Sequence, residues 1–236
     1  MGGDRPKVLF EARGKPLLEW VLDALSAAGL RDIVCVVGFG KDEVVAKLPT
    51  GVRWVEQSPQ LGTGHAVMCA RPSFPDGEDP VLVGCGDMPL IRPETYRTMI
   101  DLRAREDADC ALLTVRIPPE SSFGRVLRSP GGGVERIVEV KDASPAERAA
   151  EEGNAGVYCF RPDALWDALE RIGNENAQGE YYLTDVIEIL LGQGGRVSAH
   201  VCEDEQEALG VNTPADLEQV EHVLRKREEH EDRARG

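Results

Sequence analysis

The sequence predicts an α/β protein with a mostly parallel sheet, helices on both faces of the sheet and a small β-containing insertion. Short apolar runs, often β-branched, alternate with amphipathic helical segments along the chain, as in strands joined by crossover helices. The alternation loosens only between about residues 121 and 156, and no repeat or linker divides the chain. With 236 residues, the chain can bury a sizeable core without disulfides or structural metal.

The first elements follow this alternation closely. Leucine and valine recur on one helical face of residues 15–29, and Gly29 ends that helix. The continuous β-branched run at 33–38 predicts a strand covered on both faces. A short strand over 52–55 and a helix over 62–71 come next.

The middle of the chain adds two further strands and then the insertion. We expect a strand over 81–85, a helix over 93–106 and a strand over 110–117. The segment Ser-Pro-Gly-Gly-Gly at 129–133 is typical of a hairpin turn and precedes a strand over 134–140. These residues form the predicted insertion beside the sheet.

The last third returns to the α/β pattern. A polar helical stretch covers 144–152, and a strand follows over 156–160. Helical periodicity then predicts two helices, over 162–172 and 180–191, and a last strand lies over 197–202.

The domain is expected to span residues 1–220. A helix begins after Asn212, and residues 221–236 carry mixed charges. Mixed charges along a helix are typical of a solvated face. We therefore interpret 221–236 as a charged helical end or tail.

The charge balance excludes several partners. There are 42 Asp and Glu residues against 27 Lys and Arg, a net charge of −15. Affinity for DNA or RNA comes from clustered Lys and Arg, so no nucleic acid partner is expected. No apolar run approaches the ~18 residues that span a bilayer, so no membrane is expected either. A small nucleotide stays compatible with this charge, and the oligomeric state is left open.

The cysteines indicate a reducing compartment. The chain has six cysteines, none of them in a Cys-x-x-Cys pair, and most lie in apolar stretches. Such residues are typical of buried free thiols. We expect a cytoplasmic protein.

One polar motif joins a predicted strand to a predicted helix. The segment 57–66 reads Gln-Ser-Pro-Gln-Leu-Gly-Thr-Gly-His-Ala and falls at the carboxyl edge of the sheet, where open α/β sheets bind ligands. Its glycines permit close backbone approach, and the amide of Gln57 can offer a donor and an acceptor to a pyrimidine. The structural alternative is a tight strand-to-helix turn.

A second motif places a carboxylate at the same edge. The predicted strand over 81–85 is followed directly by Gly86 and Asp87, and Pro89 ends the ladder. Magnesium prefers hard oxygen ligands, usually one or two carboxylates together with phosphate oxygens and water. Asp87 is therefore a candidate magnesium ligand, with a turn or helix cap as the alternative.

Several motifs together resemble one known family. In order along the chain they are 60–66 (QLGTGHA), 86–90 (GDMPL), 123–126 (FGRV), 138–143 (VEVKDA), 154–157 (NAGV), 178–185 (QGEYYLTD) and 210–212 (GVN). In this order they resemble the uridylyltransferase domain of bacterial UDP-N-acetylglucosamine pyrophosphorylases, over roughly residues 6–220. The resemblance implies a Rossmann-like nucleotidyltransferase sheet with a sugar-binding insertion.

The resemblance also implies roles for the base-binding and metal-binding residues. Gln57 would recognise uracil, and Gly62 and Thr63 would hold the base. Asp87 and Asn212 would coordinate a Mg²⁺ ion that bridges substrate phosphates.

Further residues would bind the sugar phosphate. By the same resemblance, Gly124, Glu139 and Asn154 would hold the sugar, and Thr184 would lie near its phosphate. Lys7 would contact phosphate and act with Asp87 as a catalytic residue. Taken singly, the residues favour a structural interpretation: Glu139 and Lys7 as solvated charges, and Asn154 as part of a turn.

The implied reaction joins UTP and N-acetylglucosamine 1-phosphate into UDP-N-acetylglucosamine and pyrophosphate, with Mg²⁺ as cofactor. No protein nucleophile is required, because the sugar phosphate itself attacks the α-phosphorus. Two alternatives stay open: a catalytically silent protein that binds nucleotide sugars, and a nucleotidyltransferase for another sugar phosphate or base.

The resemblance further implies a buried strand and a glycine-rich loop ahead of Pro6, and the printed sequence begins without them. In the family this strand lies at the centre of the sheet and the loop grips the triphosphate. We therefore expect an N-terminally truncated or degenerate domain of low stability and low turnover.

Overall fold

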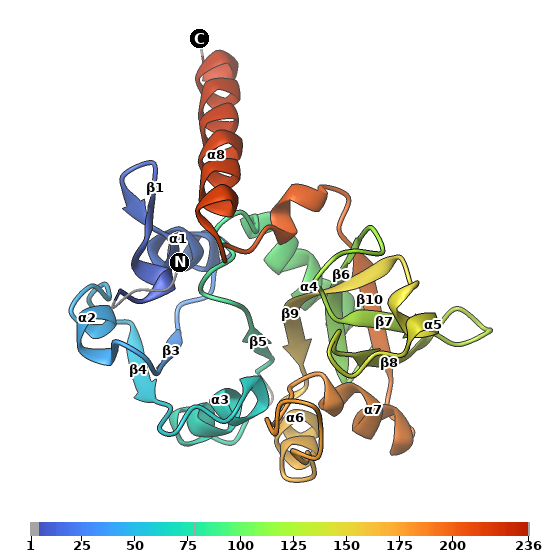
Figure 1. Ribbon diagram of the computed structural model, residues 1–236. Helices are drawn as coiled ribbons and strands as arrows, with labels where there is room; N and C mark the ends of the chain where they lie inside the picture. Colours follow the sequence, from blue (N-terminus) through green and yellow to red (C-terminus); the bar gives the residue numbers. More distant parts are fainter. Residues whose placement is uncertain (1–4, 78, 236) are drawn as a thin grey trace.

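Figure 1 shows the computed structural model, which describes residues 5–77 and 79–235. Residues 1–4 of the predicted domain and Gly236 of the predicted tail lie outside the described part. The helices are α1 (Leu17–Ala27), α2 (Lys41–Val45), α3 (Thr63–Ala70), α4 (Pro93–Arg105), α5 (Pro145–Arg148), α6 (Pro162–Leu169), α7 (Asp185–Gly192) and α8 (Pro214–Arg235). Short 3-10 segments lie at Lys7–Leu9, Arg71–Ser73 and Glu205–Ala208.

Within the described residues, the strands form three sheets. They are β1 (Glu11–Ala12), β2 (Lys15–Pro16), β3 (Val34–Val37), β4 (Arg53–Glu56), β5 (Val81–Val83), β6 (Cys110–Arg116), β7 (Arg125–Arg128), β8 (Val134–Val138), β9 (Glu152–Phe160) and β10 (Val197–Val201). The largest sheet has the order β10-β6-β9-β7-β8, and β5 also pairs with β9. A separate sheet joins β3 to β4, and β1 pairs with β2.

The strand directions and helix positions confirm the predicted α/β class. Strand β3 runs parallel to β4, and β10 runs parallel to β6. Both β5 and β6 pair antiparallel with β9, so β5, β6 and β10 share one direction and β9 runs against them. The antiparallel hairpin β7–β8 is the predicted insertion.

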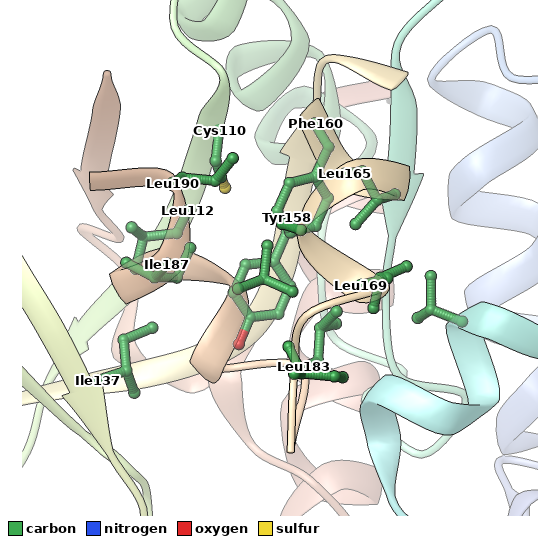
Figure 2. Packing of buried hydrophobic residues seen from close by; sticks show 14 of the residues in the cluster. Cys110, Leu112, Ile137, Tyr158, Phe160, Leu165, Leu169, Leu183, Ile187 and Leu190 are labelled. Carbon is green, nitrogen blue, oxygen red and sulfur yellow. The ribbon is translucent and has the colours of Figure 1, made fainter. Parts of the chain in front are cut away.

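Strands β6 and β9 form the centre of the core, because successive side chains of a strand point to opposite faces. One face packs against α6 and α7, as Figure 2 shows, through Cys110, Leu112, Tyr158, Phe160, Leu165, Leu169, Ile187 and Leu190. The other face packs against α4 through Ala111, Leu113, Val115, Val157, Cys159, Tyr96, Met99 and Leu102. Helices therefore cover both faces, as the alternation predicted.

The helix predicted over 180–191 begins later in the structure than the sequence suggests. Helix α7 begins at Asp185, and the residues before it lie against the glycine motif. The amide of Tyr181 donates to the carbonyl of Leu61 at 2.8 Å, and the carbonyl of Tyr181 accepts from the amide of Gly64 at 2.7 Å. These bonds occupy backbone groups that a helix would use, so tertiary pairing overrides helical propensity here.

The predicted helix over 15–29 is also shorter, because its first residues belong to a hairpin. Lys15 and Pro16 form β2 and pair with β1, so α1 starts at Leu17.

At the other end of the chain, α8 runs without a break through the predicted boundary at residue 220 and extends away from the rest of the molecule in Figure 1. Across the described ranges, no helix is both long enough and apolar enough to cross a membrane.

Candidate nucleotide and sugar-phosphate site

Strand β9 changes its neighbour halfway along, and this change positions the candidate site. Residues 158–160 pair with β5, whereas Gly153 pairs with Arg125 at the start of β7. The β6–β9 ladder is irregular at the same level, and Gly156 has a φ of +69°, a conformation that favours glycine. The segment after β5 and the segment before β7 therefore meet around residues 154–156.

Lys7, Asp87 and Asn212 come from distant parts of the chain and meet at one point. The Nζ atom of Lys7 donates to Oδ2 of Asp87 at 3.0 Å and to Oδ1 of Asn212 at 2.7 Å. The amide of Val211 donates to the carbonyl of Asp87 at 3.0 Å, which joins the two loops directly. The three residues predicted for phosphate and magnesium thus form one cluster.

The oxygen atoms of this cluster fit Mg²⁺ in chemistry and in direction. Oδ2 of Asp87 and Oδ1 of Asn212 contact the same ammonium nitrogen, so both point to one place. Magnesium takes such oxygen ligands and completes its shell with phosphate oxygens and water. Within residues 5–77 and 79–235, no group of three or more His, Cys, Asp or Glu residues is placed so that it could hold a metal ion. Magnesium here would therefore depend on substrate phosphates as further ligands.

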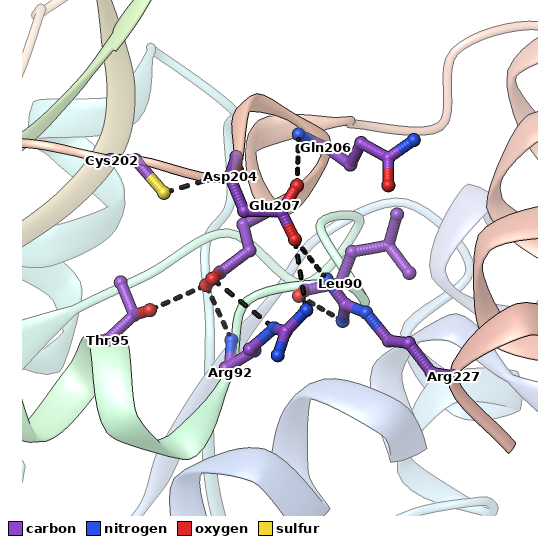
Figure 3. A network of polar contacts seen from close by, with 8 residues as sticks. All are labelled: Leu90, Arg92, Thr95, Cys202, Asp204, Gln206, Glu207 and Arg227. Atoms are coloured by element: carbon purple, nitrogen blue, oxygen red, sulfur yellow. Dashed lines mark hydrogen bonds and ion pairs between the residues drawn. The ribbon is translucent and has the colours of Figure 1, made fainter. Parts of the chain in front are cut away.

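A buried carboxylate holds together the loops that follow Asp87 and precede Asn212 (Figure 3). Glu207 is 5% exposed. It accepts hydrogen bonds from the backbone amide of Arg92 at 2.9 Å and from Oγ1 of Thr95 at 2.6 Å. The start of α4 is therefore tied to the segment that leads to Asn212.

Helix α8 joins the same network. Oδ2 of Asp204 accepts from Nη2 of Arg92 at 3.1 Å and from Nη2 of Arg227 at 3.3 Å. Nη1 of Arg227 donates to the carbonyl of Leu90 at 2.7 Å. The last helix thus braces the loop that carries the candidate metal ligand.

We expect replacement of Glu207 by alanine to lower the free energy of unfolding by about 3 kcal/mol, since it leaves a buried hydroxyl and a backbone amide without their acceptor. Urea titration measures the change. Glu205→Ala, at an exposed position of the same 3-10 segment, is the matched control and should change stability by less than about 0.5 kcal/mol. Equal effects of the two variants would show that the buried hydrogen bonds contribute little.

Gln57 is buried at the start of the glycine motif, with 8% of its surface exposed. Its Nε2 donates to the carbonyl of Gly62 at 2.8 Å and lies 3.1 Å from Nδ1 of His65. Gly62 has a φ of +108°, and a Cβ there would lie 2.6 Å from the carbonyl oxygen of Tyr181, so the position requires glycine. The amide nitrogen of Gln57 is thus occupied within the protein.

The predicted sugar-phosphate residues form a second cluster. Oγ1 of Thr184 donates to Oε1 of Glu139 at 3.3 Å, and a Cβ on Gly124 would lie 3.4 Å from Oε2 of Glu139. The amide of Asn154 donates to the carbonyl of Gly124 at 2.9 Å. Nδ2 of Asn154 donates to the hydroxyl of Tyr158 at 2.6 Å, which orients the Asn154 side chain.

Two contacts connect the clusters. The amide of Leu183 donates to Oγ1 of Thr63 at 3.1 Å, next to Thr184, and the Cys85 thiol donates to the carbonyl of Gly156 at 3.6 Å, close to Asp87. Through these contacts the glycine motif, the sugar-phosphate cluster and the Lys7–Asp87–Asn212 cluster are linked in series. Sequence reasoning missed the positioning contacts of His65 and Tyr158; His65 stands inside the glycine motif, whereas Tyr158 belongs to an apolar strand that carries no such signal.

Burial, and to a smaller extent neighbouring carboxylates, raises the pKa values of two acids in the sugar-phosphate cluster. Burial raises the pKa of Glu139 above its usual range, opposed by the hydrogen bond from Thr184. Burial, with the nearby charges of Glu188 and Asp142, raises the pKa of Asp185 to about 6. The folded state therefore binds a proton at Asp185 more tightly than the unfolded chain, in which an Asp pKa is about 3.9. Ionised Asp185 consequently lowers stability, and this loss develops as the pH rises from about 4 through about 6.

Asp185→Asn is therefore expected to raise the free energy of unfolding at pH 7 by about 1 kcal/mol, a value reduced because the side chain is only half-buried. At pH 3 the gain should vanish, since Asp185 is then largely protonated in both states. Urea titrations at the two pH values measure it. Asp163→Asn, at an exposed acid in the first turn of α6, should show no such pH-dependent gain, and an equal gain there would contradict the assignment.

A cavity of about 590 Å³ lies elsewhere, with Arg116, Arg128, Glu152 and Val201 among the residues of its wall. Arg128 and Glu152 pair with each other across 2.5 Å. None of the predicted site residues lines this cavity, so it is separate from the candidate site.

The chain belongs to the family of MobA-like NTP transferase domains, whose model matches residues 1–188. It is accordingly a member of a nucleotidyltransferase family, the class of protein that the motifs implied.

Among curated proteins, it is 42% identical over 94% of its length to the bifunctional protein GlmU of Oceanobacillus iheyensis, covering 49% of that protein. It is 43% identical over 98% of its length to GlmU of Lactococcus lactis subsp. cremoris, covering 50%. The chain thus spans about half the length of these relatives.

The fold is shared with a solved nucleotide-sugar enzyme. UDP-glucose pyrophosphorylase in complex with UDP-glucose superimposes with a TM-score of 0.75 at 16% identity, over 94% of this chain and 91% of that one. This similarity concerns the fold.

Proposed function

We propose that this domain joins UTP and N-acetylglucosamine 1-phosphate into UDP-N-acetylglucosamine and pyrophosphate, with Mg²⁺, in the cytoplasm. The observation that carries the proposal is the convergence of the Lys7 ammonium, the Asp87 carboxylate and the Asn212 amide oxygen after β5. A cation beside two hard oxygen ligands suits pyrophosphate chemistry. The family motifs around this cluster support the choice of sugar.

The residues act by binding and orienting the two substrates. Gln57 and the glycine motif hold the uracil ring. Glu139 accepts hydrogen bonds from the sugar, and the side-chain amide of Asn154 donates to it. Lys7 binds phosphate and offsets negative charge at the reacting centre. When bound at Asp87 and Asn212, Mg²⁺ would neutralise charge on phosphate oxygens. The sugar phosphate oxygen then attacks the α-phosphorus in line with the leaving pyrophosphate.

A second candidate is a protein that binds nucleotide sugars without turnover. It is favoured by the modest cationic charge of the described site, where Lys7 is the cation in contact with Asp87 and Asn212, whereas a triphosphate carries several negative charges. Calorimetric titration with UDP-N-acetylglucosamine and UTP, combined with an assay of pyrophosphate release, separates the two. Turnover supports the enzyme, and product binding without turnover supports the silent protein. Tighter binding of another nucleotide sugar would show that the proposed substrate is wrong.

Gln57→Ala is expected to weaken binding of UDP-N-acetylglucosamine by about 1–3 kcal/mol, because the base loses a buried hydrogen-bond partner. Calorimetry measures the affinity, and an unchanged melting temperature would show that the fold is intact. Equal affinity of the wild-type chain for UDP and CDP would contradict recognition of uracil at this position.

A further inference from the structure

The amide of Gln57 is oriented by its surroundings. The carbonyl oxygen of Gly62, 2.8 Å away, can only accept a hydrogen bond, so the atom of Gln57 that faces it must be the nitrogen. The residues on either side of Gly62 are held in place by backbone bonds: the amide of Tyr181 donates to the carbonyl of Leu61, and the amide of Gly64 donates to the carbonyl of Tyr181. The Gln57 amide cannot turn over without bringing two carbonyl oxygens together.

The same nitrogen determines the tautomer of His65. Nδ1 of His65 lies 3.1 Å from Nε2 of Gln57, and an amide nitrogen only donates. Nδ1 must therefore be unprotonated and accept, which leaves the ring proton on Nε2. That atom faces the Cys69 sulfur at 3.8 Å, an acceptor placed one helical turn along α3.

Both N–H groups of Gln57 are consequently used inside the protein, and its carbonyl oxygen is left for a ligand. In the described part of the chain Oε1 makes no hydrogen bond, and it is not among the buried side-chain atoms without a partner, which are Nε of Arg103 and Nε of Arg227. Solvent can therefore reach Oε1. The site offers an acceptor at Gln57 rather than a donor and acceptor pair.

We infer that His65 is a positioning residue for base selection: its unprotonated Nδ1 retains the Gln57 amide nitrogen so that only an acceptor faces the pyrimidine. Uracil carries a proton on N3 and donates to this acceptor. Cytosine carries a lone pair on N3, which the same acceptor repels. The inference rests on the proposed function, since it assumes a pyrimidine nucleotide next to Gln57.

The test compares UDP and CDP affinities of the full chain with Mg²⁺, by calorimetry, for the wild type, His65→Leu and His65→Asn. The wild type should prefer UDP. His65→Leu frees one amide N–H and should reduce the UDP-to-CDP affinity ratio about fivefold, the effect of roughly one hydrogen bond. His65→Asn keeps an acceptor near the position of Nδ1 and should retain most of the ratio, a rescue that a purely structural role would not produce.

Three results would overturn the inference. One is an unchanged ratio in His65→Leu, and another is an equal loss in both variants; either leaves the proposed function standing if the wild type still binds UDP. The third is an NMR spectrum of labelled wild-type chain in which Nδ1 of His65 is protonated. A wild type that binds neither nucleotide overturns the proposed function, and the inference falls with it.

Discussion

Asp87→Asn is expected to abolish the Mg²⁺-dependent part of nucleotide-sugar binding while the fold is retained. The change replaces an anionic oxygen ligand with a neutral amide of the same shape, and magnesium depends on carboxylate ligands. It also removes the charge partner of Lys7, whose Nζ lies 3.0 Å from Asp87 Oδ2. Titration of UDP-N-acetylglucosamine with and without Mg²⁺ measures the effect.

The matched control is Asp101→Asn, at an exposed acid on α4, which should leave the Mg²⁺ dependence as in the wild type. An unaltered melting temperature of Asp87→Asn would show that the loss is not unfolding. If the variant binds with unchanged magnesium dependence, Asp87 is not the metal ligand.

An added N-terminal strand and glycine-rich loop should increase both stability and turnover. Within the described residues, β3 pairs only with β4, and β5 pairs only with β9. Each of these strands therefore has one edge without a ladder partner, and pairing of such backbone groups stabilises a sheet. We expect the extension, fused ahead of Asp4, to raise the melting temperature by roughly 5–10 °C and to increase the rate of pyrophosphate release.

Two shorter extensions separate the contributions. The strand without the loop should raise the melting temperature but not turnover, because the loop supplies the amides and arginine that the resemblance assigns to the triphosphate. An extension with its apolar positions changed to serine should do neither. If the extended chain has the same melting temperature and turnover as the chain without the extension, the unpaired edges of β3 and β5 do not accept such a strand.

The sequence by itself determined the order and type of the main elements. Apolar periodicity depends only on near neighbours, so it located α1, α4 and the strands β3, β5 and β6 to within a few residues. The motifs also indicated which loops follow strands at one edge of the sheet. That was enough to place Asp87 and the glycine motif in a common site, because the carboxyl ends of parallel strands lie together.

Only the tertiary structure decided how these side chains are used. The bonds from Lys7 to Asp87 and to Asn212 join residues that are 80 and 205 positions apart in the sequence. A local sequence pattern cannot predict contacts between residues so far apart. The change of partner along β9 brings Asn154 between the ends of β5 and β7, and backbone pairing with the glycine motif keeps residues 180–184 out of a helix. The sequence likewise leaves two possible orientations for the side-chain amide of Gln57. The fold allows only one, because Nε2 lies between two acceptors, the carbonyl of Gly62 and Nδ1 of His65. Hydrogen-bond direction depends on what lies opposite, and that is set by packing between distant segments.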